Sequence, residues 1–291
     1  MPDTREHRGP HPDDRELFAP AMLPRLREAL ADFSMLLTKG YADKSSLKLV
    51  GDRFNLTQRQ RLAIMRAACS DQRLESRLAH QVPIETLAGQ PIAIDGYNLL
   101  ITIEAALSGG LIFQGRDGCF RDLASIHGTY RKVEETIPAI QLIGDFLTEV
   151  GIAQTRGEGV PPLHRGPNPV PTSAAGTHDT PLPQVLWLLD SPVSNSGRLK
   201  TLLAELAQDH GWPWEIRLTI SPDAELSSQL TVPVGWGLPH RSPDNRQLPV
   251  VVVTTDSVIL DACQKWTNLA AEIIIQRLPQ SATINLQQTP A

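Results

Sequence analysis

Acidic side chains follow several short apolar runs of this sequence, and their positions are the first indication of chemistry. If these runs are parallel strands, their carboxyl ends share one edge of a sheet, where α/β proteins bind ligands. We therefore expect four aspartates to gather at that edge. The runs are residues 92–94, 185–189, 215–218 and 250–253, and the acids that follow them are Asp95, Asp190, Asp223 and Asp256.

Four carboxylates at one edge repel one another unless something neutralises them. A hard divalent cation such as Mg²⁺ or Mn²⁺ does so, because it prefers carboxylate oxygens and water. A metal site of this kind suits phosphodiester hydrolysis. The alternative is that each aspartate only caps a helix, because Asp is favoured at that position. Asp256, which precedes a predicted helix, is the clearest example of this alternative.

The elements that must position these acids alternate along the chain. Strands separated by helices predict a parallel sheet covered on both faces, which is the three-layer α/β/α class. An all-helical segment precedes it, where Thr57 and Gln60 have the spacing of a capping box. The helices predicted after the first strand are residues 136–150, 198–209, 257–263 and 268–278.

Charge divides the chain unevenly. Residues 25–77 hold 11 Lys/Arg against 6 Asp/Glu, whereas residues 78–291 hold 13 against 21. The basic segment and a basic stretch after the first strand are candidates for gripping a nucleic-acid backbone. The alternative in both places is a solvated helix face. The candidate nucleic-acid-binding residues are Arg59, Arg61, Arg66, Arg116, Arg121, Arg131 and Lys132.

Composition predicts the domain organisation. The hydrophobic share of 41% excludes a wholly disordered chain. We expect a disordered tail over residues 1–17, a basic helical domain over 18–88 and an α/β domain over 89–291. A proline-rich stretch at about 153–184 interrupts the last domain and predicts a disordered insertion.

The cysteines and the hydropathy of the sequence indicate the cellular compartment. The three cysteines lie far apart without a C-x-x-C pair, which favours a reducing cytoplasm. No apolar run reaches the length of a membrane span, and no secretory signal is visible. We therefore expect a cytoplasmic protein that does not associate with membranes.

Several of these motifs resemble a known family. Asp95-Gly96-Tyr97-Asn98 resembles the opening D-x-x-N of PIN-like and NYN-type domains, and the segments around Asp223 and Asp256 resemble their later acidic motifs. Longer strings, such as IAIDGYNLLITIEAALSGG, resemble an uncharacterised prokaryotic family. That family joins an N-terminal helical domain of unknown function 434 to a PIN-like C-terminal domain.

The resemblance implies a PIN-like sandwich with a metal-dependent ribonuclease site. Asp95, Asp223 and Asp256 match the metal-binding acids, Asn98 is the polar residue beside the first of them, and Asp190 joins as a fourth acid. PIN enzymes often supply one more acid from a helix. Three residues between the first and middle motifs are candidates for it, namely Glu104, Asp117 and Asp122.

Three functions follow from these patterns. The first is a Mg²⁺- or Mn²⁺-dependent ribonuclease whose catalytic residues are the four aspartates and Asn98. The second is a non-catalytic RNA-binding or regulatory module with the same fold. The third, an unrelated nucleotide-binding enzyme, is disfavoured because no glycine-rich fingerprint follows the first strand. RNA is the expected partner, and a homodimer is compatible with the sequence.

Overall fold

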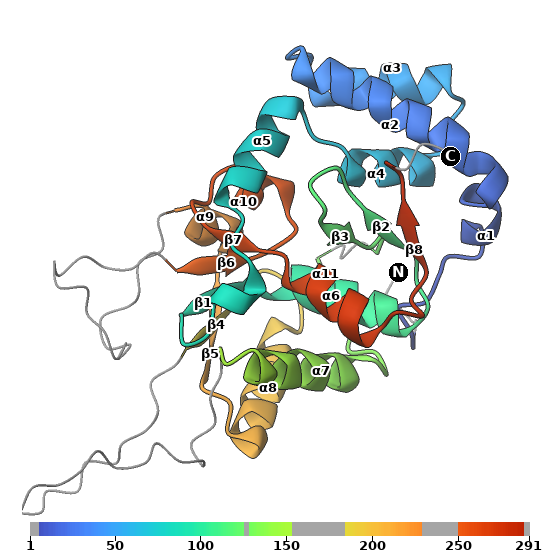
Figure 1. The fold of residues 1–291 in the computed structure, drawn as a ribbon. Helices are drawn as coiled ribbons and strands as arrows, with labels where there is room; N and C mark the ends of the chain where they lie inside the picture. Colours follow the sequence, from blue (N-terminus) through green and yellow to red (C-terminus); the bar gives the residue numbers. More distant parts are fainter. Residues whose placement is uncertain (1–5, 125–127, 153–183, 229–249, 288–291) are drawn as a thin grey trace, which may run out of the picture.

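The computed structural model describes residues 6–124, 128–152, 184–228 and 250–287 (Figure 1). The predicted proline-rich insertion lies outside these ranges except for its last residue. Within them, five strands form one parallel sheet in the order β5-β4-β1-β6-β7. The strands are β1 (Ile92–Asp95), β4 (Val185–Asp190), β5 (Trp214–Thr219), β6 (Val251–Val253) and β7 (Trp266–Thr267).

Helices cover both faces of this sheet, as the sequence predicts. Side chains alternate along β1, so that Ile92 and Ile94 enter one apolar cluster while Ala93 enters another. The first cluster packs against α6 (Gly96–Leu107), α7 (Thr136–Glu149), α8 (Ser196–His210) and α11 (Leu269–Arg277). The second cluster includes side chains of α9 (Pro222–Ser227) and α10 (Ser257–Leu260). The three-layer α/β/α prediction is thereby confirmed.

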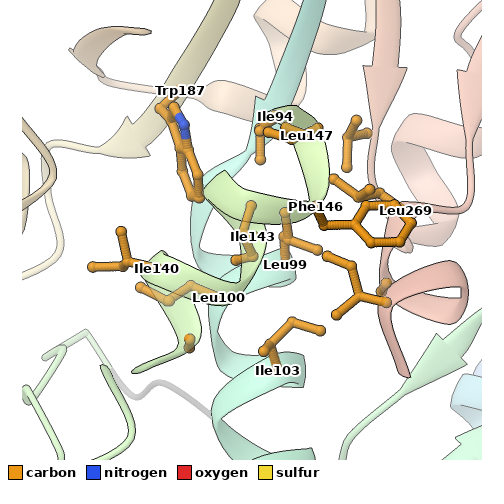
Figure 2. Packing of buried hydrophobic residues seen from close by; sticks show 14 of the residues in the cluster. Ile94, Leu99, Leu100, Ile103, Ile140, Ile143, Phe146, Leu147, Trp187 and Leu269 are labelled. Carbon is orange, nitrogen blue, oxygen red and sulfur yellow. The ribbon is translucent and has the colours of Figure 1, made fainter. Parts of the chain in front are cut away.

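The larger cluster lies between the sheet and the helices α6, α7, α8 and α11. Figure 2 shows Ile94 of β1 next to Leu147 of α7, with Trp187 of β4 on one side and Leu269 of α11 on the other. Trp187 is completely buried. Burial of a large apolar side chain contributes roughly 1.5–3 kcal/mol. This packing fixes the strand ends, and with them the acids that follow.

A second, smaller sheet was not predicted. It has the order β3-β2-β8 within the described residues and contains β2 (Ile112–Gln114), β3 (Phe120–Arg121) and β8 (Thr283–Asn285). These strands are too short to give a periodic pattern. In addition, β8 pairs with β2 although most of the α/β segment separates the two strands in sequence. The sheet shares an apolar cluster with the helical segment, in which the rings of Phe18 and Phe113 meet edge to face at 4.9 Å.

The N-terminal segment is helical, as expected. Its α-helices are α1 (Asp14–Leu17), α2 (Leu23–Thr38), α3 (Asp43–Arg53), α4 (Gln58–Ala67) and α5 (Asp71–His80), and its 3₁₀ turns are η1 (Pro20–Met22) and η2 (Ile84–Thr86). The predicted capping box is confirmed, because Thr57 and Gln60 satisfy each other's backbone N–H groups at the start of α4. None of the helices in the described ranges combines the length and apolar character that a membrane crossing demands.

Residues 6–17 differ from the predicted disordered tail. Arg8 is buried and its Nε donates to Glu104 at 2.8 Å, while its guanidinium lies 5.2 Å from the centre of the Tyr130 ring. Composition cannot reveal this contact, because the partners are far apart in sequence. A buried ion pair of this kind ties the segment to α6.

A buried carboxylate joins the helical segment to the α/β part. Asp117 accepts from Arg77 of α5 at 2.5 Å and from Arg121 of β3 at 2.7 Å. Burial alone would raise the pKa of Asp117, but the two guanidinium groups lower it to about 2. Arg121 also donates to the Thr255 carbonyl at 2.7 Å. This cluster therefore holds the loop that carries Asp256.

The start of α6 generates a stability prediction. A Cβ at Gly96 would lie 2.6 Å from Leu189 Cδ2 and 2.8 Å from the Leu188 carbonyl oxygen. The second of these atoms belongs to the backbone of β4, which cannot move aside without a cost in stability. We expect Gly96→Ala to destabilise the protein by roughly 1–3 kcal/mol in urea unfolding.

Gly197→Ala is the matched control, because this glycine also lies in the first turn of a helix and has open space around it. It should be neutral or stabilise by up to about 1 kcal/mol. Equal stability of the two variants would contradict the close packing of α6 on β4.

Candidate active site

One cavity of about 510 Å³ collects the predicted site residues. Its acidic wall is the carboxyl edge of the large sheet, and the wall opposite comes from α2, α3, α4 and α5. The chain adds β4 and β5 on one side of β1 and β6 on the other, so this edge is a topological switch point of the kind that binds ligands. The acids and the amide that line the cavity are Asp43, Asp95, Asn98, Asp122, Asp190, Asp223 and Asp256.

Asp95 is the most constrained of these carboxylates. It is only 6% exposed and accepts one side-chain hydrogen bond, from Thr254 Oγ1 at 2.9 Å. It stands at the N-cap position of α6 but its side chain does not cap that helix. Burial raises the pKa of Asp95 to about 7, and the charges of Asp256, Asp223 and Asp190 act in the same direction. Capping therefore does not explain this residue.

Asp256 and Asp223 differ in whether they cap a helix. Asp256 does cap α10, accepting from the backbone N–H groups of Val258 at 2.7 Å and Ile259 at 3.2 Å. The capping interpretation thus holds for Asp256, although the residue also lines the cavity. Asp223 lies in the first turn of α9, where Ser221 provides the cap instead.

Electrostatic coupling links the same carboxylates. Partial burial raises the pKa of Asp190, and the charge of Asp223 raises it further. Partial burial and the charge of Asp256 raise the pKa of Asp223 in turn. Like charges within reach of one another disfavour ionisation. The cluster of ionised aspartates therefore lowers the stability of the folded protein unless a cation neutralises it.

Asn98 is oriented by the strand-end threonines. Its Oδ1 accepts a short hydrogen bond from Thr255 Oγ1, which leaves the amide N–H groups directed elsewhere. The carbonyl of Thr255 accepts from Arg121, so the buried Asp117 cluster fixes this contact as well. Asn98 is therefore positioned to donate hydrogen bonds in the cavity it lines.

The predicted basic residues separate into two groups. Arg66 lines the cavity and is 27% exposed, with its guanidinium donating to the carbonyls of Asp122 and Ala124. Arg121 lines it too, but it is buried against Asp117. The others lie outside the cavity lining, and they are Arg59, Arg61, Arg116, Arg131 and Lys132.

Three of those outer residues are held in ion pairs. Arg59 binds the buried Asp14, Arg61 binds Asp52 at 2.8 Å, and Arg116 binds Asp71 at 2.8 Å. Arg131 is half-buried, and Lys132 is exposed. Arg59, Arg61 and Arg116 are thus already paired with carboxylates of the protein itself.

Several cavity residues are not evident from the sequence. Of the three candidates for an additional acid, Glu104 and Asp117 are enclosed in internal ion pairs, whereas Asp122 reaches the cavity. Asp122 is one of the three candidates in the sequence, but it follows β3 and does not lie on a helix, so it is not the helical acid that the resemblance implies. Arg73 of α5 and Tyr97 of α6 also line the cavity.

The carboxylates do not form a closed ligand cage. In the described ranges, no three acidic, histidine or cysteine side chains gather closely enough to hold a metal ion as they stand. Mg²⁺ does not require such a cage, because it keeps several waters and binds through one or two carboxylates together with substrate phosphates. The donor set, four coupled carboxylates with one deeply buried, is compatible with a hard divalent cation of this type.

The geometry thus defines an α/β protein with an acidic cavity at the edge of its sheet. Comparison with known proteins places the chain in a family. Residues 84–156 and 176–272, more than half of the chain, match the family described as Domain of unknown function (DUF5616), and the chain belongs to this family. Residues 25–80 match the model described as Protein of unknown function (DUF434).

The chain is also similar to an archaeal protein. An uncharacterised protein of Methanocaldococcus jannaschii is 30% identical over 127 residues, which are 44% of this chain and 61% of the relative. The chain therefore spans about three fifths of that relative's length. No solved structure matches the chain.

The buried Asp95 generates a pH-dependent prediction. Its pKa in the folded protein is about 7, above the ordinary value of 3.8, so the folded state binds the proton more tightly than the unfolded state. Its ionisation therefore costs stability above pH 7, and the cost fades as pH falls toward 4. Without metal, Asp95→Asn should stabilise the protein by about 2–4 kcal/mol at pH 8 and by progressively less at lower pH.

Denaturant unfolding in EDTA between pH 5 and 8 measures this difference. Asp145→Asn serves as the control, because Asp145 lies on the exposed side of α7 and should show almost no change. A destabilised Asp95→Asn protein at pH 8 would contradict the electrostatic description of the site.

Proposed function

We propose that this protein is a metal-dependent ribonuclease of PIN-like type that hydrolyses phosphodiester bonds. One observation carries the proposal: the four strand-end aspartates and Asn98 line one cavity, and burial and mutual repulsion raise the pKa of three of those acids. Strongly perturbed acids in a cleft are typical of functional sites. The likeness to PIN-like domains rests on the sequence motifs alone.

The acids would share a Mg²⁺ or Mn²⁺ ion. Asp95, Asp223 and Asp256 are its proposed ligands, and Asp190 is a ligand or accepts hydrogen bonds from nearby water. When bound, the cation would supply the positive charge that a phosphodiester needs as negative charge develops on its oxygens. Asp256 can serve in this way while its Oδ1 caps α10, because a carboxylate accepts through both oxygens.

Donors from both walls of the cavity would complete the binding of the phosphate. The amide N–H groups of Asn98 suit a phosphate oxygen, because its Oδ1 is already occupied by Thr255. Arg66 and Arg73 line the cavity from α4 and α5, and both are partly exposed. A guanidinium donates through five N–H groups and can therefore bind a phosphate while keeping part of its internal pairing.

The reaction would be a displacement at phosphorus. A water oxygen forms a bond to phosphorus, the bond from phosphorus to one ester oxygen breaks, and that oxygen leaves with a proton from solvent. Asp190 can accept the proton that the water loses, because it lines the cavity beside the proposed metal ligands and is only partly buried.

The proposed compartment is the cytoplasm. Cys69, Cys119 and Cys263, the three cysteines of the chain, are free and buried. Unpaired cysteines of this kind are typical of proteins kept in reducing surroundings.

The alternative function is a module that binds RNA without cleaving it. The partly exposed guanidinium groups of Arg66 and Arg73 at the cavity are equally compatible with this function. In that case the acids would repel the backbone, and neutralising Asp95 would leave RNA affinity equal or higher. Metal binding and cleavage separate the two functions.

Metal binding generates the third prediction. A cation that binds only the folded state raises the melting temperature by mass action. We expect millimolar Mn²⁺ to raise Tm of the wild-type protein by several degrees, and to raise it much less in Asp223→Asn. Differential scanning calorimetry with Asp145→Asn as control measures this shift. Equal Mn²⁺ shifts in Asp223→Asn and the wild type would place the metal elsewhere.

Cleavage generates the fourth prediction. Asp95→Asn keeps the size of the side chain but removes the charge that a hard cation requires. We expect Mn²⁺-dependent cleavage of a labelled single-stranded RNA to fall at least about a hundredfold, whereas Asp145→Asn cleaves normally. Arg66→Gln should instead weaken RNA binding and reduce its salt dependence.

The outcomes of this assay are distinct. Equal cleavage by the wild type and Asp95→Asn would point to a contaminant or another site. No cleavage by the wild type with several RNAs and both metals would favour the binding module.

A further inference from the structure

A buried hydroxyl group in the cavity wall is left without a hydrogen-bond partner. Tyr97 follows Asp95 by two positions, lies in the first turn of α6 and is only 5% exposed. Its hydroxyl forms no hydrogen bond, although buried hydroxyl groups almost always do. Tyr97 lines the same cavity as the four aspartates.

The neighbouring Tyr130 shows what a structural tyrosine looks like in this fold. The two rings lie 5.3 Å apart and both pack in the same apolar cluster. The Tyr130 hydroxyl donates to Glu104 at 2.6 Å and lies 3.1 Å from Thr136 Oγ1. The ring of Tyr97 contributes equally to the core, but its hydroxyl contributes no contact there. A phenylalanine would fill the same space without the cost of an unpaired polar group.

The surroundings of the hydroxyl restrict the ligand that it can take. The negative charge of Asp190 acts on this phenol, and Asp95 and Asn98 lie on the same helix terminus. A neutral phenol in such a place is a hydrogen-bond donor that lacks an acceptor. Because the hydroxyl is buried at the wall, only a ligand seated deep against the sheet edge would reach it.

We propose that the Tyr97 hydroxyl donates a hydrogen bond to a nonbridging oxygen of the phosphodiester, which makes Tyr97 a substrate-binding residue. This inference rests on the proposed function, because its ligand is the phosphodiester that the proposed ribonuclease would bind. The phosphate would enter between the acids and Arg66, with Asn98 and Tyr97 as neutral donors on the acidic side. Neutral donors are suited to that side, since they bind the anion without pairing with the carboxylates.

The test compares Tyr97→Phe with Tyr130→Phe. Binding of a fluorescein-labelled single-stranded RNA is measured by anisotropy with Ca²⁺ present, and Tm is measured on the same samples. We expect Tyr97→Phe to weaken RNA binding about tenfold, the scale of one hydrogen bond to a charged group, at an equal or higher Tm. Tyr130→Phe should do the reverse, lowering Tm while leaving RNA affinity nearly unchanged.

DNA of the same sequence identifies the acceptor. Equal loss of affinity for RNA and DNA in Tyr97→Phe supports a phosphate oxygen, whereas loss confined to RNA would overturn that assignment in favour of the ribose 2′-hydroxyl. Unchanged RNA affinity in Tyr97→Phe, or no RNA binding by the wild type, would overturn the proposal entirely.

Cleavage with Mn²⁺ is scored separately on the same proteins. If the wild type binds RNA through Tyr97 but does not cleave it, the ribonuclease function fails while the role of Tyr97 stands.

Discussion

The buried contact of Asp117 with Arg77 and Arg121 is the interaction on which the site depends. Arg77 also binds Asp261 and the Ser257 carbonyl, and Arg121 binds the Thr255 carbonyl. These contacts hold the segment around Asp256 between the helical part and the sheet. Loss of the carboxylate would leave two buried guanidinium groups facing each other, which costs far more than the ion pair itself contributes.

Two buried aspartates in this protein show opposite electrostatics. Two arginines lower the pKa of Asp117 to about 2. Burial, together with the charges of three other carboxylates, raises the pKa of Asp95 to about 7. The first stabilises the folded protein at neutral pH, and the second destabilises it. Asp117 is compensated by two arginines, whereas Asp95 has no cationic partner, and a bound cation would remove the cost of its burial. This contrast is the physical basis for assigning function to Asp95 and structure to Asp117.

The sequence is informative where the pattern is local. Short β-rich runs ending in aspartate predict the sheet edge, because parallel strands place their carboxyl ends together. The capping box at Thr57 and Gln60 is equally local, and it is present. The acids at Asp95 and Asp190 could therefore be assigned to one edge without a structure.

Contacts between segments that are distant in sequence could not be predicted. The burial of Arg8 against Glu104 and the pairing of Arg59 with Asp14 depend on contacts between distant segments. Basic residues read as a nucleic-acid surface are therefore partly internal ion pairs. The cavity position of Asp122 and the unpaired hydroxyl of Tyr97 also required the assembled fold, because neither residue type is unusual in its local sequence.

The central claim is that the four aspartates form a cation site, and anomalous diffraction from a crystal soaked in Mn²⁺ tests it most directly. The account predicts an anomalous peak in the cavity within about 2.2 Å of an oxygen of Asp95 or its neighbours, a metal–oxygen distance typical of such ions. A cavity without a peak at millimolar Mn²⁺, or Mn²⁺ bound only elsewhere on the protein, would contradict it.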